Sequence, residues 1–425
     1  MTGHFTPLFV LISALAAASA IQTRCPWDPV IPSLRSSGSC GIPIDDDTDG
    51  LARENQNAPW THRPYCVVPL STGPIEKFCV YSSSAFNHGS GVSVITTPQA
   101  AASIAGAIQD PLPAWRFRRH LSHQGHLATE TYDLPYTVMP IPGKGLGVVA
   151  TKHIKQFEVI MTSFPAMIAD NAFFPSEGDE SPVEYPRLFQ KALDQLPDKE
   201  RFLALTRSKG DDFDPVEDLI RTNAFGVTVN GRNAKGVYPE IARLNHACDP
   251  NAYSKFTSRD LAMSAVATRD IMPGEEITIS YIPLGMPTSH RHRALGNWGF
   301  NCTCALCSAP DEAREASDRR REQLIELYYA MQEESTDYDS LIKLTREFIE
   351  LAQVERLIAK VGEYYRVFMR IYYEIGDPES AKKYGQAALK FAEIFSDPEG
   401  VFCTGLRQDL AVLERVLSDR QSGAG

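Results

Sequence analysis

Cysteine spacing restricts the folds open to this chain more than any other feature of its sequence. Cys302, Cys304 and Cys307 fall within six residues, a spacing typical of metal ligands but one ligand short of a tetrahedral thiolate site. Cys248 is the only other cysteine in the central part of the chain, so it is the candidate for the fourth ligand. A fold that forms this site has to bring the chain back to Cys248 after many intervening residues.

Four other cysteines follow a segment that resembles a secretory signal peptide. Leu8 to Ala18 is apolar and Ala18-Ser19-Ala20 matches a cleavage site, although no Lys or Arg precedes the apolar run. After a signal peptide, the four cysteines predict two disulfides with three possible pairings, whereas in the cytosol four reduced thiols are expected. These four residues are Cys25, Cys40, Cys66 and Cys79.

Length and local patterns indicate two or three domains and an α+β fold class. The 425 residues are too many for one hydrophobic core. Strand-like pieces lie on both sides of a stretch with helical spacing, and long helical patterns follow Pro310. The predicted regions are a signal peptide at 1–20, a cysteine-containing region and linker at 21–130, a β-rich domain at 131–308 with a helical insertion at about 174–218, and a helical domain at 311–420.

The charge balance favours a basic partner over a nucleic acid. The formal net charge is −11, whereas a general nucleic-acid binder needs a basic face to neutralise phosphates. A Lys-rich peptide would suit this balance, although a negative charge also serves solubility alone. No segment after the first 20 residues has the length and purity of a membrane span.

Three further segments indicate a chemistry when they are taken together. Gly143-Lys-Gly145-Leu-Gly147 alone is a turn, and Arg243-Leu-Asn-His-Ala-Cys-Asp-Pro-Asn251 alone is a polar corner. Gly274-Glu-Glu-Ile-Thr-Ile-Ser-Tyr281 alone is a hairpin that ends on a tyrosine. In this order, and followed by the cysteine triplet, they resemble the SET-domain protein lysine methyltransferases over residues 136–307.

The resemblance implies small β-sheets around a knot-like crossing, closed by a zinc cluster after the SET core. The chain looks most like the branch of the SET-and-MYND proteins and their fungal relatives, because it has a helical insertion, an aromatic pair at Trp298 and Phe300, and a tetratricopeptide-like helical region after the cysteines. The MYND finger itself is absent from the pattern. Two positions depart from the family: Ser163 stands where it often has Glu, and Phe157 where a small residue is common.

The same resemblance assigns the site residues. S-adenosylmethionine would be the methyl donor, and Phe300 would stack on its adenine. The residues expected to bind it are Lys144, Gly145, Gly147, Asn223, Asn245, His246 and Phe300. One structural zinc would be held by Cys248, Cys302, Cys304 and Cys307.

Tyr281 is the catalytic residue that the resemblance implies. A tyrosine hydroxyl beside the transferred methyl group can orient a neutral lysine amine and stabilise the transition state. Tyr238 is either a further residue of the lysine channel or a core tyrosine. The predicted activity is methyl transfer to the side-chain amine of lysine in a protein or peptide, such as a histone-like basic protein.

An alternative function and the cellular compartment stay open at this level. The alternative is a catalytically inactive SET-fold binding module, secreted and stapled by disulfides. The signal-like segment points to the secretory pathway, whereas a thiolate zinc site and the SET resemblance point to the nucleus or cytoplasm.

Overall fold

The computed structural model describes seven stretches of the chain. They are residues 59–67, 77–109, 134–174, 185–207, 214–296, 298–331 and 337–422. Residues 58–425 form one compact unit. The signal-like segment, Cys25 and Cys40 lie outside the described residues, so the signal peptide and the pairing of these two cysteines stay predictions.

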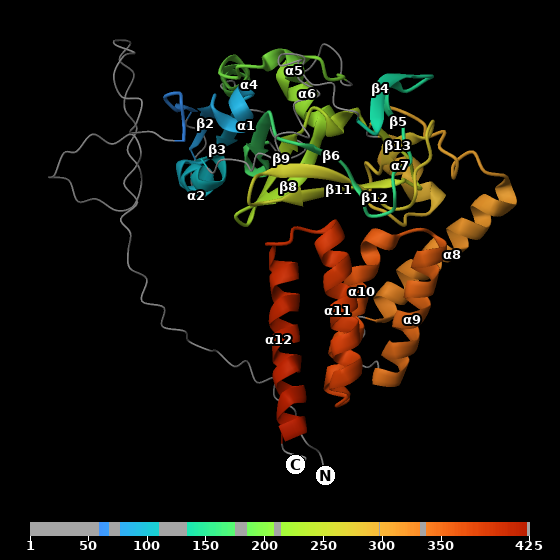
Figure 1. Ribbon diagram of the computed structural model, residues 1–425. Helices are drawn as coiled ribbons and strands as arrows, with labels where there is room; N and C mark the ends of the chain where they lie inside the picture. Colours follow the sequence, from blue (N-terminus) through green and yellow to red (C-terminus); the bar gives the residue numbers. More distant parts are fainter. Residues whose placement is uncertain are drawn as a thin grey trace, which may run out of the picture. The chain divides into compact units, whose positions relative to one another are not determined.

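The largest sheet joins strands from two regions that the sequence analysis kept apart (Figure 1). Its order is β1 (Tyr65–Val67), β2 (Phe78–Ser83), β3 (Val92–Thr96), β7 (Met167–Asp170), β9 (Arg232–Val237) and β8 (Ala224–Val229). The central pairing is parallel, with Ser93 opposite Met167. Helices α1 (Phe86–Gly89) and α2 (Pro98–Gln109) flank β3 in sequence. The predicted boundary near residue 131 therefore falls between strands of one continuous sheet.

Burial explains why the early strands join this sheet. Every residue of β2 and β3 is buried, as expected for strands covered on both faces. Val80 and Ile95 pack in one apolar cluster with Met167 and with Leu188 of the following helix. No pattern within residues 65–96 alone could reveal that partner, because parallel pairing depends on residues far along the chain.

Two smaller sheets carry the motif segments. One has the order β10 (Asn245–His246), β13 (Glu276–Ile279), β5 (Gly145–Ala150) and β4 (Tyr136–Ile141). The other has the order β11 (Ala252–Thr257), β12 (Ala262–Ala267) and β6 (Val159–Ser163). The mixed sheets confirm the predicted α+β class.

Short helices lie within and directly beside the predicted insertion at about 174–218. They are the 3-10 turn η2 (Asn171–Phe173), α4 (Tyr185–Asp194), α5 (Lys199–Leu203) and α6 (Pro215–Asn223). The Asp214 carboxylate accepts from the backbone N–H groups of Val216 and Glu217, which caps α6 at its first turn. A second 3-10 turn, η3 (Ile241–Arg243), leads into β10, and α7 (Thr288–Gly296) follows β13.

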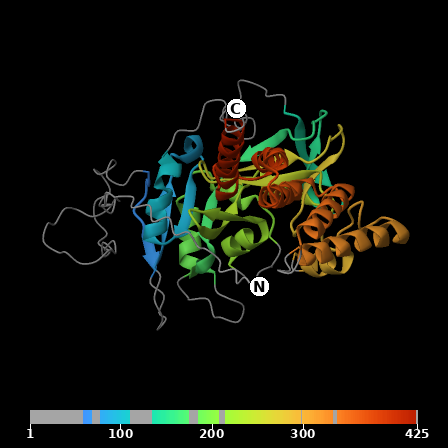
Figure 2. The ribbon, with the colours of Figure 1, turned by 90° about the horizontal axis from the view of Figure 1, so that it is seen from below.

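In the described residues after the cysteine triplet, five helices confirm the predicted helical region (Figure 2, orange to red). They are α8 (Asp311–Ala330), α9 (Tyr338–Val354), α10 (Ile358–Glu374), α11 (Pro378–Phe395) and α12 (Val401–Ser422). Helix α11 packs closely against both neighbours through small residues. A Cβ on Gly385 would come within 2.8 Å of both Met369 Sδ and Leu410 Cδ2. Among the described helices, none combines the length and apolar character needed to span a bilayer.

Phe157 connects the SET-like part to the helical region. Its φ of +70° is unfavourable for a residue with a side chain. Its ring makes edge-on contacts with Phe391 and Phe395 of α11, with ring centroids 6.1 and 5.9 Å away. Lys255 Nζ also donates to the Glu393 carbonyl oxygen over 2.6 Å. The departure from a small residue at position 157 thus supplies an aromatic contact between the two parts.

Candidate functional site

The Gly-rich segment forms the turn between β4 and β5 and lies against Asn245. Gly143 and Gly145 have φ of +72° and +71°, which explains glycine at these two positions. Gly147 is required for a different reason: a Cβ there would lie 2.5 Å from Ile141 Cγ1 and 2.7 Å from Asn245 Nδ2. The glycines therefore let the turn curve and let Asn245 approach its backbone.

Glu276 ties the turn to the Asn-His segment. Its carboxylate is 2.7 Å from Lys144 Nζ and accepts a hydrogen bond of 2.9 Å from Asn245 Nδ2. Asn245 Nδ2 also lies 3.2 Å from the Leu146 carbonyl oxygen. Glu276 was not among the site residues predicted from the sequence, although it lies in the motif that ends at Tyr281. The Lys144 ammonium is thus paired with a carboxylate of the protein.

Asn245 and His246 point to opposite faces of their sheet. They form β10, which pairs in parallel with β13, and successive side chains of a strand alternate between faces. Asn245 shares the face of Glu276, whereas the His246 ring is buried, with 4% of its surface exposed. His246 Nδ1 accepts from the Tyr281 backbone N–H over 3.0 Å, and Nε2 lies 3.2 Å from Cys248 Sγ.

Tyr281 is held at both its backbone and its hydroxyl group. The hydroxyl donates to the Leu244 carbonyl oxygen over 2.8 Å. Burial, with a smaller contribution from the Glu276 carboxylate, raises the pKa of Tyr281 above its usual value of 10. The hydroxyl is therefore protonated at neutral pH and is a hydrogen-bond donor. Trp298 lies on its ring at a centroid distance of 5.0 Å, and Phe300 stands edge-on at 6.4 Å.

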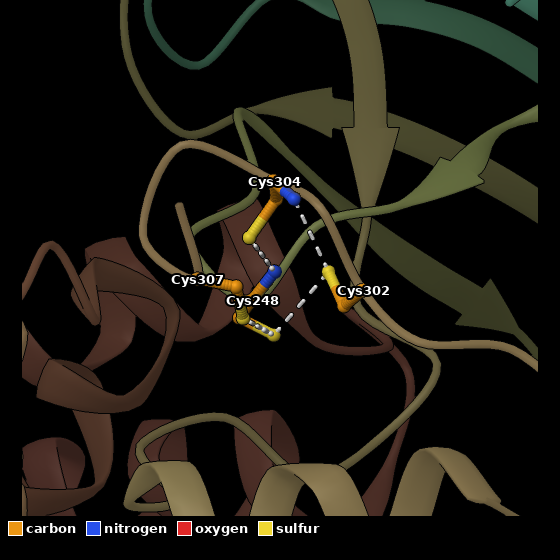
Figure 3. Close-up of side chains that lie close together, drawn as sticks. All are labelled: Cys248, Cys302, Cys304 and Cys307. Carbon is orange, nitrogen blue, oxygen red and sulfur yellow. Dashed lines mark hydrogen bonds between the residues drawn. The ribbon is translucent and has the colours of Figure 1, made fainter. Parts of the chain in front are cut away.

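The four central cysteines converge as the spacing predicted (Figure 3). Their sulfur atoms all lie within 4.8 Å of one another. Cys248 Sγ is 3.8 Å from Cys302 Sγ and 3.6 Å from Cys307 Sγ. A tetrahedral zinc site with Zn–S bonds of about 2.3 Å has sulfur atoms about 3.8 Å apart. The donor set and its spacing therefore fit one zinc ion.

Hydrogen bonding within the cluster already favours thiolates at two positions. Bonds from Cys248, with contributions from its neighbours, lower the pKa of the Cys304 thiol to about 5. Bonds from Cys248, Cys304 and Cys307, and a smaller one from His246, hold the pKa of Cys302 well below its usual value. Hydrogen bonds to Cys302, Cys304 and Cys307 raise the pKa of Cys248, because they favour the protonated thiol that donates them. A divalent cation would balance the charge of four thiolates.

Comparison with known proteins identifies this part of the chain. Residues 145–282 match the family model of the SET domain. This chain contains a SET domain. The match includes the Gly-rich turn from Gly145, the Asn-His segment and Tyr281, and the cysteine triplet lies after its end.

Three curated relatives are lysine methyltransferases by name. Identity is 29% over 191 residues to the histone-lysine N-methyltransferase set5 of Schizosaccharomyces pombe, covering 44% of this chain and 56% of the relative. It is 41% over 78 residues to the human histone-lysine N-methyltransferase SMYD3, 18% of each chain. It is 29% over 198 residues to the human N-lysine methyltransferase SMYD2, covering 40% of this chain and 45% of the relative. The chain matches about half or less of each relative's length.

Two predicted cofactor residues lie at the margins of the SET site. The Asn223 amide donates to the carbonyl oxygens of Thr206 and Leu219 over 2.7 and 2.8 Å, so it stabilises the end of α6 in the insertion. Phe300 is 37% exposed, and its ring centroid is 6.1 Å from that of His246. The roles of both residues in cofactor binding stay predictions.

Tyr238 belongs to the core of the SET domain. It is fully buried, and its ring fills the space that a side chain on Gly236 would need. Phe225 stands edge-on to it, with ring centroids 6.1 Å apart. Of the two interpretations from the sequence, the structure supports the core tyrosine.

Asn251 supports the site by bonding to the backbone of β13, and it was not predicted from the sequence. Its Oδ1 accepts from the Thr278 N–H over 2.8 Å, and its Nδ2 donates to the Glu276 carbonyl oxygen over 2.9 Å. It is 3% exposed, so these bonds are shielded from water. Its position could have pointed to it, because Asn251 is the last residue of the Arg243–Asn251 segment. Asn251 fixes β13, which carries Glu276 and leads to Tyr281.

Proposed function

We propose that this chain transfers a methyl group from S-adenosylmethionine to the side-chain amine of lysine in a protein. The observation that carries the proposal is the Tyr281 hydroxyl, fixed on the Leu244 carbonyl oxygen next to an aromatic wall, within a SET domain. The names of the relatives support protein lysine methylation as the reaction class. No observation favours the alternative of an inactive binding module.

The residues around the Gly-rich turn fit an adenosyl ligand. A Cβ at Gly145 would meet no atom within 4 Å, so the turn has open space beside it. Leu146 and Phe300 expose 45% and 37% of their surface, although both are apolar. A purine ring can cover such an apolar, flat surface, and exposed backbone groups of a Gly-rich turn can bind polar groups of a ligand.

Tyr281 would orient the lysine and not act as a base: its one proton is donated to Leu244, so the hydroxyl oxygen accepts from an N–H of the amine and leaves the nitrogen lone pair free. S-adenosylmethionine supplies a methyl group on a positively charged sulfur, which leaves as a thioether when the lone pair of the lysine nitrogen attacks. The Tyr281 hydroxyl keeps its proton at neutral pH, because burial raises its pKa. Once the cofactor and substrate cover the aromatic surroundings of Trp298 and Phe300, the neutral form of the lysine amine would be favoured, since desolvation disfavours its charged form. The product is a methylammonium that keeps both amine protons, and the proton released overall is the one that the lysine ammonium loses to solvent before it attacks.

The cysteine cluster would hold the segment that carries Trp298 and Phe300. All four positions are cysteines, so a zinc bound there has no open position for water and is structural. Cys302 follows Phe300 by two residues. The metal would thus fix one wall of the site and take no part in methyl transfer.

A basic protein is the substrate class that we propose. The formal net charge is −11, and two of the relatives are named for histone lysine. A negative chain attracts a Lys-rich substrate through long-range electrostatics. These observations concern charge and relatedness, so methyl transfer to a histone mixture is the direct test of the substrate class.

Replacing Tyr281 by Phe tests the reaction. We expect the turnover of tritiated methyl transfer to a histone mixture to fall by roughly 10²- to 10³-fold, because one preorganised hydrogen-bonding group is lost in the transition state. The affinity for S-adenosylhomocysteine should change little, since the ring remains.

Tyr238→Phe is the matched control. It removes the same group from a fully buried tyrosine whose hydroxyl makes no hydrogen bond to a described residue. Its turnover should match that of the wild type. Equal turnover of wild type and Tyr281→Phe would rule out Tyr281 as the catalytic residue, and no transfer by the wild type to any protein would refute the proposed function.

A further inference from the structure

Both nitrogen atoms of the His246 ring bind other parts of the protein. Nδ1 accepts the Tyr281 backbone N–H over 3.0 Å. A neutral imidazole that accepts at one nitrogen carries its proton on the other. Nε2–H therefore points to Cys248 Sγ, 3.2 Å away. The ring is almost completely buried, and no nitrogen is left to contact a cofactor.

We propose that His246 is a positioning residue that links the four-cysteine cluster to Tyr281. One side of its ring holds a sulfur of the cluster, and the other holds the backbone of the tyrosine. The half that concerns Tyr281 rests on the proposed methyl transfer, whereas the half that concerns the cluster does not. The cofactor contact predicted for His246 from the sequence stays a prediction, and the role proposed here is a separate one for its side chain.

The strand pairing supports this role independently of the hydrogen bonds. Asn245 lies on the face of Glu276 and the Gly-rich turn, and the alternation of β10 sends His246 to the other face. His246 pairs with Ile279, two residues before Tyr281. The Ala247 N–H also donates to the Ile279 carbonyl oxygen over 3.0 Å. The backbone of β10 and the imidazole thus hold the same end of β13.

His246 and Leu244 together hold the backbone and the hydroxyl group of Tyr281. The Tyr281 hydroxyl is fixed by Leu244, and its backbone N–H by His246. Both acceptors lie within four residues of Cys248 in the chain. A displacement of Cys248 would therefore shift both hydrogen bonds that orient Tyr281.

A bond from the imidazole also stabilises the cluster when a metal is bound. A sulfur that ligates zinc is a thiolate, and an N–H donor to a charged acceptor makes a stronger hydrogen bond than one to a neutral acceptor. Partners that bind metal ligands in this way orient them, and their loss typically lowers metal affinity by about 10- to 100-fold.

Two substitutions separate the two sides of the ring. In His246→Asn, the side-chain oxygen can take the place of Nδ1 and accept from Tyr281, but nothing reaches Cys248. In His246→Gln, the side-chain amide can take the place of Nε2 and donate to Cys248, but the acceptor for Tyr281 is lost. His153→Gln is the control, because His153 is exposed and, among the described residues, its ring pairs with Asp270 and with no cysteine of the cluster.

Zinc release from the full-length, zinc-loaded protein to a colorimetric chelator is the first measurement. We expect His246→Asn to release zinc about 10- to 100-fold faster than the wild type, with His246→Gln and His153→Gln close to the wild type. In cobalt-substituted protein, the thiolate-to-metal charge-transfer band of His246→Asn should move to lower energy, because an unbonded thiolate is a better electron donor. Neither readout depends on methyl transfer.

Steady-state kinetics and binding of S-adenosylhomocysteine are the second measurement. His246→Gln should lower kcat, while the Kd for S-adenosylhomocysteine and the melting temperature stay near those of the wild type. Equal zinc release by His246→Asn and His246→Gln would overturn the link to the cluster. Loss of S-adenosylhomocysteine binding with zinc and melting temperature intact would show that the ring contacts the cofactor instead. Absence of turnover in the wild type would refute the proposed function but leave the zinc result decisive for the cluster.

Discussion

The chain uses cysteine in two regions with opposite chemistry. Cys66 and Cys79 lie directly opposite each other on β1 and β2 and form a disulfide, with Cα atoms 3.9 Å apart. Cys248 and the triplet Cys302–Cys307 lie outside the strands and keep four free thiols within 4.8 Å of one another. An antiparallel pair presents only two facing side chains at one position, whereas loops can bring four sulfur atoms together.

The difference shows that local geometry, and not the number of cysteines, decides their chemistry. Two opposed strand positions place one sulfur beside one other, which suits a covalent bond. Four converging thiols accumulate negative charge as they ionise, which suits a cation. The first arrangement persists in an oxidising compartment and the second in a reducing one, so the two regions make opposite demands on the environment.

Removal of a cluster thiol should have the largest effect on the cofactor site. In Cys304→Ser, we expect the metal content to fall from about one zinc per chain to much less, since a four-thiolate site loses a ligand. Binding of S-adenosylhomocysteine should weaken with it, because metal binding and local folding are coupled. Metal analysis and thermal shift with the ligand measure the two effects.

Cys403→Ala is the control for this prediction. Cys403 is a buried thiol of α12 outside the cluster, so its loss should leave zinc unchanged. Zinc-free protein that still binds the ligand at wild-type affinity would separate the cluster from the cofactor site.

Glu276→Gln should have an intermediate effect. It tests whether cofactor binding at the Gly-rich turn depends on the contacts of Glu276 with Lys144 and Asn245. The substitution keeps the shape but removes the charge that pairs with Lys144 at 2.7 Å. Lys144 and Glu276 are partly exposed, so we expect only a several-fold loss of S-adenosylhomocysteine affinity, with zinc content unchanged. Isothermal titration and metal analysis test this pattern. A loss of zinc would show that the Gly-rich turn and the cysteine cluster form one cooperative unit.

Cleavage of the disulfide should have the smallest effect on the site. In Cys79→Ala, the cofactor affinity and zinc content should equal those of the wild type, because the pair lies in a different sheet from the Gly-rich turn. The cross-link joins residues 13 positions apart. Its loss should lower stability by up to about 3 kcal/mol on the chain-entropy estimate. Chemical denaturation measures the stability, and a fall in cofactor affinity as large as that of Cys304→Ser would contradict the contrast between the two regions.

The compartment determines which of the two cysteine regions forms in the cell. If the segment at 1–20 is a signal peptide, protein from the medium should begin at Ile21 and contain the disulfide. Protein retained in cells with Met1 intact would remove the secretory prediction. Sequencing of the N-terminus from both fractions distinguishes the two outcomes.

The sequence by itself determined the features that depend on spacing and order along the chain. It indicated Cys248 as the partner of the distant triplet, because Cys248 is the only other cysteine in the central part of the chain. It also predicted the helices after Pro310 and in the insertion, since helical periodicity is a local property. The pattern singled out the glycines at 145 and 147, and their role in cofactor binding stays a prediction; only the tertiary structure shows that the physical reasons for glycine differ between them.

Tertiary structure alone decided the features that depend on long-range contacts. The parallel pairing of β3 with β7 joins the early strands to the SET region, and neither strand contains a pattern that names the other. Glu276 acquires its role from Lys144 and Asn245, and Phe157 from α11. The direction of the His246 ring follows from the pairing of β10 with β13. A local pattern states which residue is present, whereas its partners depend on how distant segments pack.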